Sequence, residues 1–201
     1  MLFSRLIVTL PKNKHEKTKM TYEKTHIDGV VIITPRVFED ARGYFFESFK
    51  KDEFEENVGK INFVQENESR SSKGVLRGLH YQKGNSAQAK LVRVISGRVV
   101  DVAVDIRKSS PTFGKYVMVE LSDANKKQLF IPRGFAHGFF VLSDTAIFSY
   151  KVDNVYAPAD EASIRWNDPT IAIEWPTDGI CPQTSDKDNN AVMLSDACLF
   201  E

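Results

Sequence analysis

The stretch from Leu91 to Arg107, LVRVISGRVVDVAVDIR, decides the fold class. Its second half alternates, with apolar residues on one side of an extended chain and mostly polar residues on the other: Val100, Val102, Val104 and Ile106 against Asp101, Ala103, Asp105 and Arg107. A period of two indicates a β-strand with one dry face. Gly97 and Arg98 interrupt the pattern, and we expect a turn or bulge at that point.

The chain on both sides of that stretch has the same character. We expect further strands where short apolar runs are bounded by turn residues, at Gly29–Thr34, Gly43–Phe49, Asn62–Ser69, Tyr116–Leu121, Gln128–Pro132, Gly138–Leu142 and Ala146–Val152. Only Lys51–Val58 has a helical pattern, and Gly59 follows it as a natural stop. Many short strands and little helix predict an all-β sandwich or barrel, with a double-sheet jelly roll as the favoured form.

Length and composition indicate the domain organisation. A chain of 201 residues suits one domain that can bury a proper core. Residues 12–19 are polar, strongly basic and without periodicity. We therefore expect residues 1–19 to form a disordered N-terminal extension and residues 20–201 to form a single domain.

Charge and cysteine usage restrict the partners and the compartment. The chain carries 27 basic and 27 acidic side chains, so its net charge of zero provides no general attraction to nucleic acid or to an anionic membrane. No apolar run approaches the roughly 20 residues needed to cross a bilayer. Cys181 and Cys198 have no disulfide or zinc pattern, which favours a reducing, cytoplasmic location.

Two of the four histidines have unusual neighbours. In GVLRGLHYQ, Arg77 and His80 lie three residues apart and would fall on opposite faces of a regular strand, unless Gly78 bends the backbone and redirects one of them. In IPRGFAHGF, the run from Pro132 to His137 resembles the second half of the cupin signature. Metal-binding cupins add His-x-His and a Glu from the first half, where this chain has only His80. We therefore expect a cupin-like barrel without a metal, although a lone histidine in a strand is more often a core residue than a catalyst.

Six motifs occur together in one chain: DARGYFFESF (40–49), FVQENES (63–69), GVLRGLHYQ (74–82), DVAVDIRKSSPTFG (101–114), IPRGFAHGF (131–139) and SDKD (185–188). In their order and spacing, over about residues 22–195, the chain resembles the dTDP-4-dehydrorhamnose 3,5-epimerase family. One such motif would be weak, but six in register are specific. The resemblance implies a cupin-like double-stranded β-helix, an isomerase of dTDP-L-rhamnose biosynthesis, and no cofactor.

The reaction of this family explains which residue types are required. The 4-keto group of dTDP-4-keto-6-deoxy-D-glucose acidifies the hydrogens on C3 and C5, so each carbon can be inverted by proton removal and reprotonation from the opposite face. This chemistry needs a base, an acid on the other side, and positive charge at the enolate oxygen. The resemblance implies His80 as the base, Asp188 as the carboxylate that orients it, Tyr150 as the acid, and Lys90 as the cation.

The resemblance also implies a set of substrate-binding residues: Arg42, Glu47, Gln65, Glu66, Asn67, Arg77, His137, Tyr156, Glu161 and Lys187. Arg42 and Arg77 match the pyrophosphate contacts, because a planar guanidinium can bind two oxygens at once. Tyr156 matches the ring that stacks on thymine, although Val155 stands where many family members have a second tyrosine. The family forms homodimers by strand exchange, so we expect some of these residues to reach the partner's site.

Three alternatives stay open at this point. A relative that inverts only C3 or only C5 would share the same base and acid. A metal-dependent cupin oxygenase or isomerase is disfavoured by the missing His-x-His. A non-catalytic cupin that binds a sugar nucleotide is disfavoured because His80, Tyr150 and Asp188 are all present.

Overall fold

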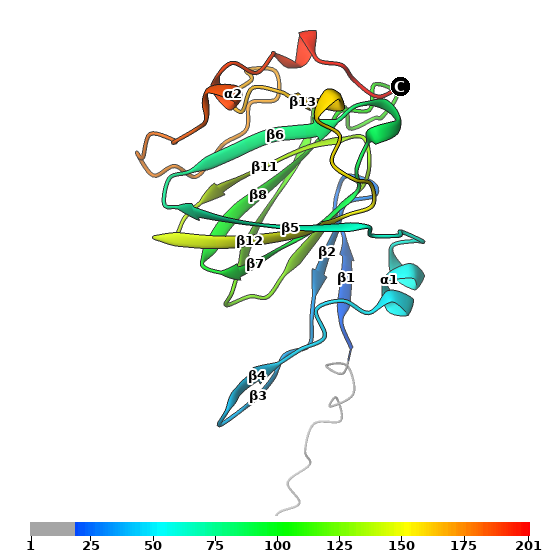
Figure 1. Ribbon diagram of the computed structural model, residues 1–201, viewed down its shortest axis with the longest axis vertical. Helices are drawn as coiled ribbons and strands as arrows, with labels where there is room; N and C mark the ends of the chain where they lie inside the picture. Colours follow the sequence, from blue (N-terminus) through cyan, green and yellow to red (C-terminus); the bar gives the residue numbers. More distant parts are fainter. Residues whose placement is uncertain (1–18) are drawn as a thin grey trace, which may run out of the picture.

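The computed structural model describes residues 19–201, which form two packed β-sheets with short helical segments around them (Figure 1). The larger sheet has six strands in the order β1 (Thr21–Lys24), β2 (Val31–Thr34), β10 (Gln128–Ile131), β7 (Lys90–Ser96), β12 (Thr145–Val152) and β5 (Gln65–Ser72). The smaller sheet has five strands in the order β13 (Glu161–Ser163), β6 (Leu76–Gln82), β11 (Phe135–Val141), β8 (Arg98–Asp105) and β9 (Tyr116–Ser122). The predicted all-β, cupin-like jelly roll is confirmed.

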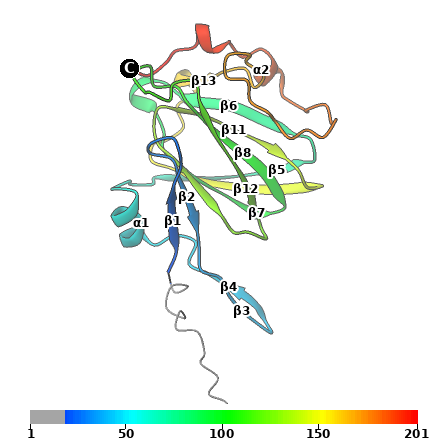
Figure 2. The same ribbon diagram turned by 180° about the vertical axis from the view of Figure 1, so that it is seen from behind.

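The remaining elements are short. The hairpin of β3 (Phe38–Asp40) and β4 (Gly43–Phe45) projects from the body of the molecule in both Figure 1 and Figure 2. The described residues contain two α-helices, α1 (Lys51–Asn57) and α2 (Asp186–Asn189), and three 3₁₀ turns, at Gly84–Ser86, Pro158–Asp160 and Leu194–Asp196. Within residues 19–201, no helix is both long and apolar enough to span a membrane.

Strand β8 corrects the prediction that the alternating stretch has only one dry face. Its alternation is present, but both of its faces are dry, because every residue from Val99 to Asp105 is buried. Val99 and Ala103 pack in the core between the two sheets. The valines of the other parity pack beneath the C-terminal segment, which covers the outer face of the five-stranded sheet (Figure 1). The parity that carries Asp101 and Asp105 is therefore the barrel interior.

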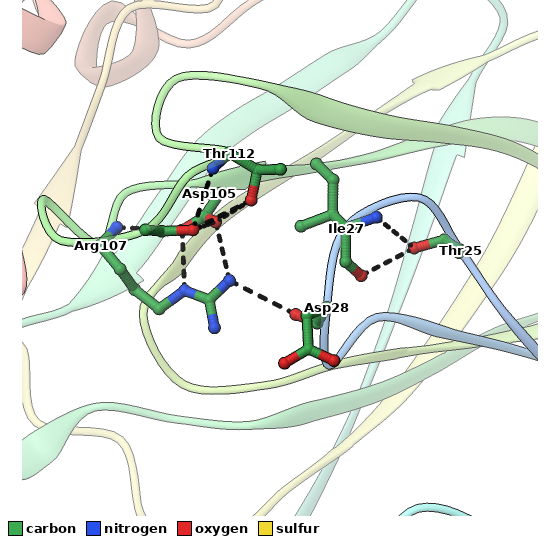
Figure 3. Close-up of polar contacts among 7 residues, drawn as sticks. Thr25, Ile27, Asp28, Asp105, Arg107 and Thr112 are labelled. Carbon is green, nitrogen blue, oxygen red and sulfur yellow. Dashed lines mark hydrogen bonds and ion pairs between the residues drawn. The ribbon is translucent and has the colours of Figure 1, made fainter.

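Asp105, at the end of β8, organises the connection to β9, which contacts the loop between β1 and β2 through Arg107 (Figure 3). Its carboxylate accepts hydrogen bonds from Arg107 Nε at 2.8 Å and Nη2 at 2.7 Å, and from the hydroxyls of Ser110 and Thr112 at 2.6 and 2.7 Å. Arg107 also donates to the backbone oxygen of Asp28, in the loop between β1 and β2, at 3.3 Å. Burial would raise the pKa of Asp105, but these donors outweigh it and lower the pKa to about 2.

A bulge in β6 redirects its side chains, as the sequence predicted from Gly78. The pairing with β11 matches His137 to His80 and Phe139 to Arg77, so three steps on β6 face two on β11. Gly78 has φ +131°, and a Cβ there would lie 2.5 Å from the Gly138 Cα. The extra residue places Arg77 and His80 on the same side, and both face one pocket.

Several predicted boundaries were shifted by tertiary structure. The strand expected at Gly43–Phe49 stops at Phe45, where the chain leaves the exposed hairpin, and the strand expected from Asn62 begins at Gln65, where pairing with β12 begins. β11 starts earlier than expected, at Phe135. β1, β3 and β13 are too short and too polar to have been predicted. The predicted extension falls, except for Lys19, outside the described residues.

Candidate active site

A pocket of about 190 Å³ opens between the two sheets, at the side where β5 and β6 lie. Eight of the residues implied by the family resemblance line it: Asn67, Arg77, His80, Lys90, His137, Tyr150, Tyr156 and Glu161. They come from β5, β6 and β13, from β7, β11 and β12, and from the loop after β12. Residues far apart in the sequence thus converge in one cavity, in the mixture of bases, acids and cations that proton transfer requires.

His80 on β6 is paired with Asp188 on α2, 108 residues later in the chain. The Nε2–Oδ1 distance is 2.5 Å, and the side chain of Asp188 is 4% exposed. Burial would raise the pKa of Asp188, but hydrogen bonds from His80, the Ser185 hydroxyl and the Gly78 backbone lower it. Asp188 is therefore held as a carboxylate, the form that orients a neighbouring imidazole and stabilises its cation.

Short-range capping explains how α2 delivers Asp188. Ser185 is the N-cap residue, and its side chain accepts a hydrogen bond from the Asp188 backbone N–H at 3.1 Å. At the other end, Arg165 Nη2 donates to the backbone oxygen of Asn189 at 2.7 Å. The helix is only one turn long, and these contacts hold it against the end of β6.

Tyr150 faces the same pocket from the opposite sheet. It lies on β12, while His80 lies on β6, so the two side chains approach the cavity from different layers. Burial raises the pKa of the Tyr150 phenol, while a hydrogen bond with Asn67 opposes the shift. Tyr150 is therefore a neutral O–H donor at ordinary pH. A base and an acid on opposite walls are what inversion at one carbon requires.

Lys90 and His137 lie deep in the cavity. Lys90 is 9% exposed, and its Nζ lies 5.9 Å from the centre of the Tyr150 ring. Burial lowers its pKa to about 8, with Asp101 and then Glu161 opposing the shift. His137 is stacked against Phe148, and burial lowers its pKa as well, again opposed by Asp101. Asp101 therefore raises the pKa of both groups, against the effect of burial.

A second set of contacts surrounds the pocket mouth. The Tyr156 hydroxyl donates to Glu161 Oε2 at 2.9 Å, and Lys187 Nζ lies 2.5 Å from Glu161 Oε1. Gln65 donates to Asn67 Oδ1 at 2.8 Å and accepts from the Tyr156 backbone N–H at 3.1 Å. Gln65 and Lys187 are therefore held through pocket residues rather than lining the cavity themselves.

Three further implied binding residues neither line the pocket of this chain nor, in contrast to Gln65 and Lys187, contact its lining residues. Glu66 points away from it and pairs with Lys151 at 2.5 Å. Arg42 lies on the β3–β4 hairpin with its side chain 90% exposed, paired to Asp40 at 2.6 Å. Glu47 follows the same hairpin, in a separate surface hollow. The β3–β4 hairpin projects away from the two sheets (Figure 2).

Sequence reasoning missed several residues of the site, of which Asp101, behind the pocket wall, is the most informative. Its Oδ1 lies 2.8 Å from His137 Nε2, and the side chain has no exposed surface. The signal was present in the run DVAVD, where two acidic residues share one parity of a strand that is otherwise apolar. Other missed residues of the wall are Glu68, Ser69, Tyr81, Gln82, Gln88, Gly138, Phe139 and Phe148.

The histidines are arranged as carboxylate pairs, not as a metal ligand set. His80 and His137 are direct partners across β6 and β11, and each presents Nε2 to its own aspartate. In residues 19–201, no group of three or more His, Cys, Asp or Glu side chains has the arrangement of a metal site.

Comparison with known proteins gives a consistent result. Residues 24–196 match the family model described as dTDP-4-dehydrorhamnose 3,5-epimerase. The enzyme of that name from Shigella flexneri is 58% identical over 182 residues, covering 90% of this chain and 99% of the relative. The one from Salmonella typhimurium is 56% identical, covering 89% of this chain and 97% of the relative.

Solved structures show the same similarity in three dimensions. A 3,5-epimerase of Legionella pneumophila in complex with dTDP-4-keto-L-rhamnose has a TM-score of 0.86 and 52% identity, covering 89% of this chain and 95% of that one. A 3'-monoepimerase of Streptomyces bikiniensis in complex with dTDP-quinovose has a TM-score of 0.81 and 35% identity, covering 85% of this chain and 86% of that one. The similarity therefore extends beyond enzymes that act on two carbons.

Proposed function

The chain belongs to the dTDP-4-dehydrorhamnose 3,5-epimerase family, and from that membership we propose that His80, Tyr150 and Lys90 carry out the epimerisation in the pocket between the sheets. The chain is an isomerase that converts dTDP-4-keto-6-deoxy-D-glucose to dTDP-4-keto-L-rhamnose. One observation carries the assignment of roles: a carboxylate-paired histidine and a buried tyrosine face one cavity from opposite sheets.

His80 is the base. Its Nε2 hydrogen bonds to Asp188, and with Nε2 protonated the other nitrogen, Nδ1, has a free lone pair to accept a proton from carbon. The proton leaves C5 or C3, the electron pair moves towards the 4-keto oxygen, and the imidazolium forms beside a buried carboxylate. Asp188 stabilises that cation and fixes the orientation of the ring.

Tyr150 is the acid on the other face. A proton delivered from the β12 side, after removal from the β6 side, inverts the carbon. The raised pKa of Tyr150 keeps the phenol protonated until it is needed. Lys90 contributes positive charge at the enolate oxygen, where a buried cation is most effective because little water screens it.

The test is solvent exchange followed by NMR. The keto substrate is incubated with the protein in D₂O, and an NADPH-dependent reductase traps the product. We expect deuterium at both C3 and C5, and we expect His80→Ala and Tyr150→Phe each to reduce the rate by roughly 10²–10⁴-fold, the usual contribution of a positioned base or acid. His26→Ala is the matched control, because His26 is exposed and lies outside the pocket.

Each outcome assigns the protein to one class. Near-full activity of both pocket variants would contradict the roles given to His80 and Tyr150. Deuterium at a single carbon would place the enzyme with single-site epimerases such as the structurally similar Streptomyces bikiniensis enzyme. Substrate binding without any exchange would identify a non-catalytic binding protein.

We further propose that two copies of the chain exchange their β3–β4 hairpins, so that Arg42 and Glu47 serve the partner's pocket. The hairpin exposes Phe38 at 45%, Tyr44 at 56% and Phe45 at 66%, and large apolar side chains in one patch are typical of an interface. Arg42 is the most exposed member of an ion pair, as expected of a cation that has a further anion to bind.

Subunit complementation tests this arrangement. Arg42→Ala and His80→Ala homodimers should each be defective, the first in substrate affinity and the second in turnover. If the hairpin serves the partner, mixed dimers contain one site with both His80 and Arg42, so mixing two weak variants restores activity. A monomer in light scattering, or no restoration after subunit exchange, would contradict the proposal.

We also propose a cytoplasmic location and a sugar nucleotide, rather than nucleic acid or membrane, as the partner. Cys181 and Cys198 are exposed, unpaired thiols, which suits a reducing compartment. The net charge of zero provides no general attraction to nucleic acid or to an anionic membrane. Fractionation of the native host would test the location, and recovery in the periplasm or the membrane fraction would contradict it.

A further inference from the structure

Asp101 is the one fully buried carboxylate in contact with the pocket wall whose hydrogen bonding is incomplete. Oδ1 pairs with His137 Nε2 at 2.8 Å, while Oδ2 has no hydrogen-bond partner in the described part of the chain. The residue lies on the inner face of β8, behind His137, with no exposed surface. An unpaired buried oxygen on an acidic side chain is costly, so packing alone does not account for Asp101.

The charge of Asp101 acts on two groups of the pocket. It hydrogen bonds to His137 directly, and of the two carboxylates that act on Lys90 it has the larger effect, with Glu161 second. Lys90 is almost fully buried, and an ammonium without a nearby negative charge loses its proton in such surroundings. Lys90 and His137 line the same pocket, while Asp101 contacts His137 from behind and does not line the cavity itself.

We propose that Asp101 is a positioning residue for the reaction, which holds His137 in its Nε2–H tautomer and acts as the counter-ion that keeps Lys90 charged for the enolate oxygen. Because the carboxylate is enclosed behind His137, it supports the cation without facing the developing negative charge itself. The inference rests on the proposed function, since the cation matters only if an enolate forms in this pocket.

The fall of kcat/KM at high pH should depend on Asp101. The other titratable groups that face Lys90 and His137 across the pocket or lie directly behind its wall are Glu68 on β5, Arg77, His80 and Tyr81 on β6, Tyr150 on β12, Tyr156 in the following loop, Glu161 on β13 and Asp188 on α2. Burial raises the pKa of Tyr81 to about 12 and also raises that of Tyr150. Lys90, whose pKa is lowered to about 8, is therefore the group that we expect to set the high-pH limb.

The decisive variant is Asp101→Asn, which removes the charge and keeps the size and the acceptor for His137. We expect the high-pH limb of kcat/KM to move down by about one pH unit, as when a neighbouring charge is removed. At a slightly acidic pH, the Asp101→Asn variant should regain most of the activity that it loses at higher pH. Asp105→Asn is the matched control on the same strand, equally buried and remote from the pocket, and it should leave the limb in place. Both are assayed at a temperature at which circular dichroism shows them folded.

Two spectroscopic readouts do not depend on turnover. Long-range ¹⁵N–¹H spectra of wild type should show His137 as the Nε2–H tautomer, and ¹³Cε shifts of labelled lysine should give Lys90 a higher pKa in wild type than in Asp101→Asn. An unmoved high-pH limb together with an unmoved Lys90 titration would overturn the proposal, and so would the opposite His137 tautomer. If Asp101→Asn fails to fold, the wild-type tautomer still decides the His137 part, and Asp101→Ser supplies the Lys90 comparison. Failure of wild type to exchange deuterium would instead contradict the proposed function, while these spectra would still report on Asp101.

Discussion

Two aspartates on strand β8, four residues apart and both without exposed surface, are treated in opposite ways by the fold. Asp105 accepts from Arg107, Ser110 and Thr112, and its carboxylate is surrounded by donors. Asp101 has one partner, His137, and one oxygen without any in the described residues. The first lies outside the pocket, and the second lies directly behind the pocket wall.

The difference separates structure from chemistry. A buried charge with all its hydrogen bonds made has nothing left to offer a ligand, so Asp105 joins the β8–β9 connection to the loop between β1 and β2 (Figure 3). A buried charge that is short of donors still acts on the groups around it, and Asp101 influences the pKa of His137 and of Lys90, which both line the pocket. Burial alone does not tell the two apart, whereas the count of donors does.

The largest effect on stability is expected from Asp105→Ala. The variant leaves the Arg107 guanidinium and two hydroxyls without their acceptor, and breaking a buried pair costs about 3–5 kcal/mol. For a chain of this size we expect the melting temperature to fall by roughly 10 °C. Urea unfolding measures the loss. Arg107→Lys, which keeps the charge but loses the two-point contact, should lose less, and an Asp105→Ala loss below about 1 kcal/mol would refute the assignment.

The acid side of the stability curve gives a second, smaller effect. The folded pKa of Asp105, about 2, lies below its ordinary value of 3.8, so the stabilisation is complete above about pH 4 and is lost as the pH falls towards 2. The difference corresponds to roughly 2 kcal/mol. Glu66, Glu161 and Asp188 have lowered pKa values too, so the quantity to measure is the difference between wild type and Asp105→Asn over that window. A constant difference from pH 5 to pH 2 would show that Asp105 is not the source.

Asp188 provides an intermediate case, because its position depends on a single helical turn. Ser185→Ala removes the cap that binds the Asp188 backbone N–H, and we expect a loss of about 1 kcal/mol in the free energy of unfolding. A few-fold lower kcat should accompany it, since His80 loses a well-placed partner. Ser185→Thr keeps a capping oxygen and should restore both quantities. Wild-type turnover in Ser185→Ala would show that β6, not the cap, sets the position of Asp188.

The strands could be predicted from local pattern, and the site largely could not. Alternation in Leu91–Arg107 correctly indicated extended structure with an interruption at Gly97, where the structure has two strands, and Gly78 correctly indicated a redirected backbone. The polar parity of β8 looked like a solvent face, because periodicity shows which residues share a face but not what covers that face. Only the second sheet makes this parity the barrel interior.

Long-range pairs were accessible through resemblance alone. His80 and Asp188 are 108 residues apart, and no spacing rule links them. The same resemblance implied Arg42 and Glu47, which this chain's own fold places away from the pocket. Asp101 was implied by neither, because its role follows from what lacks a partner around it, which is a property of packing.

The smallest expected effect on stability belongs to Asp101→Asn, and it is the sharpest test of the comparison. The substitution keeps the acceptor for His137 and removes a charge that the fold leaves underpaired, so the free energy of unfolding should change by less than about 1 kcal/mol. The two variants should thus show opposite effects. Asp105→Asn should lose stability and keep the wild-type pH–rate profile, while Asp101→Asn should keep its stability and shift the pH–rate profile. Urea unfolding of both, beside their pH–rate profiles, decides the matter. If Asp101→Asn unfolds as readily as Asp105→Asn, then Asp101 is a structural carboxylate and the number of donors around a buried charge does not distinguish the two roles.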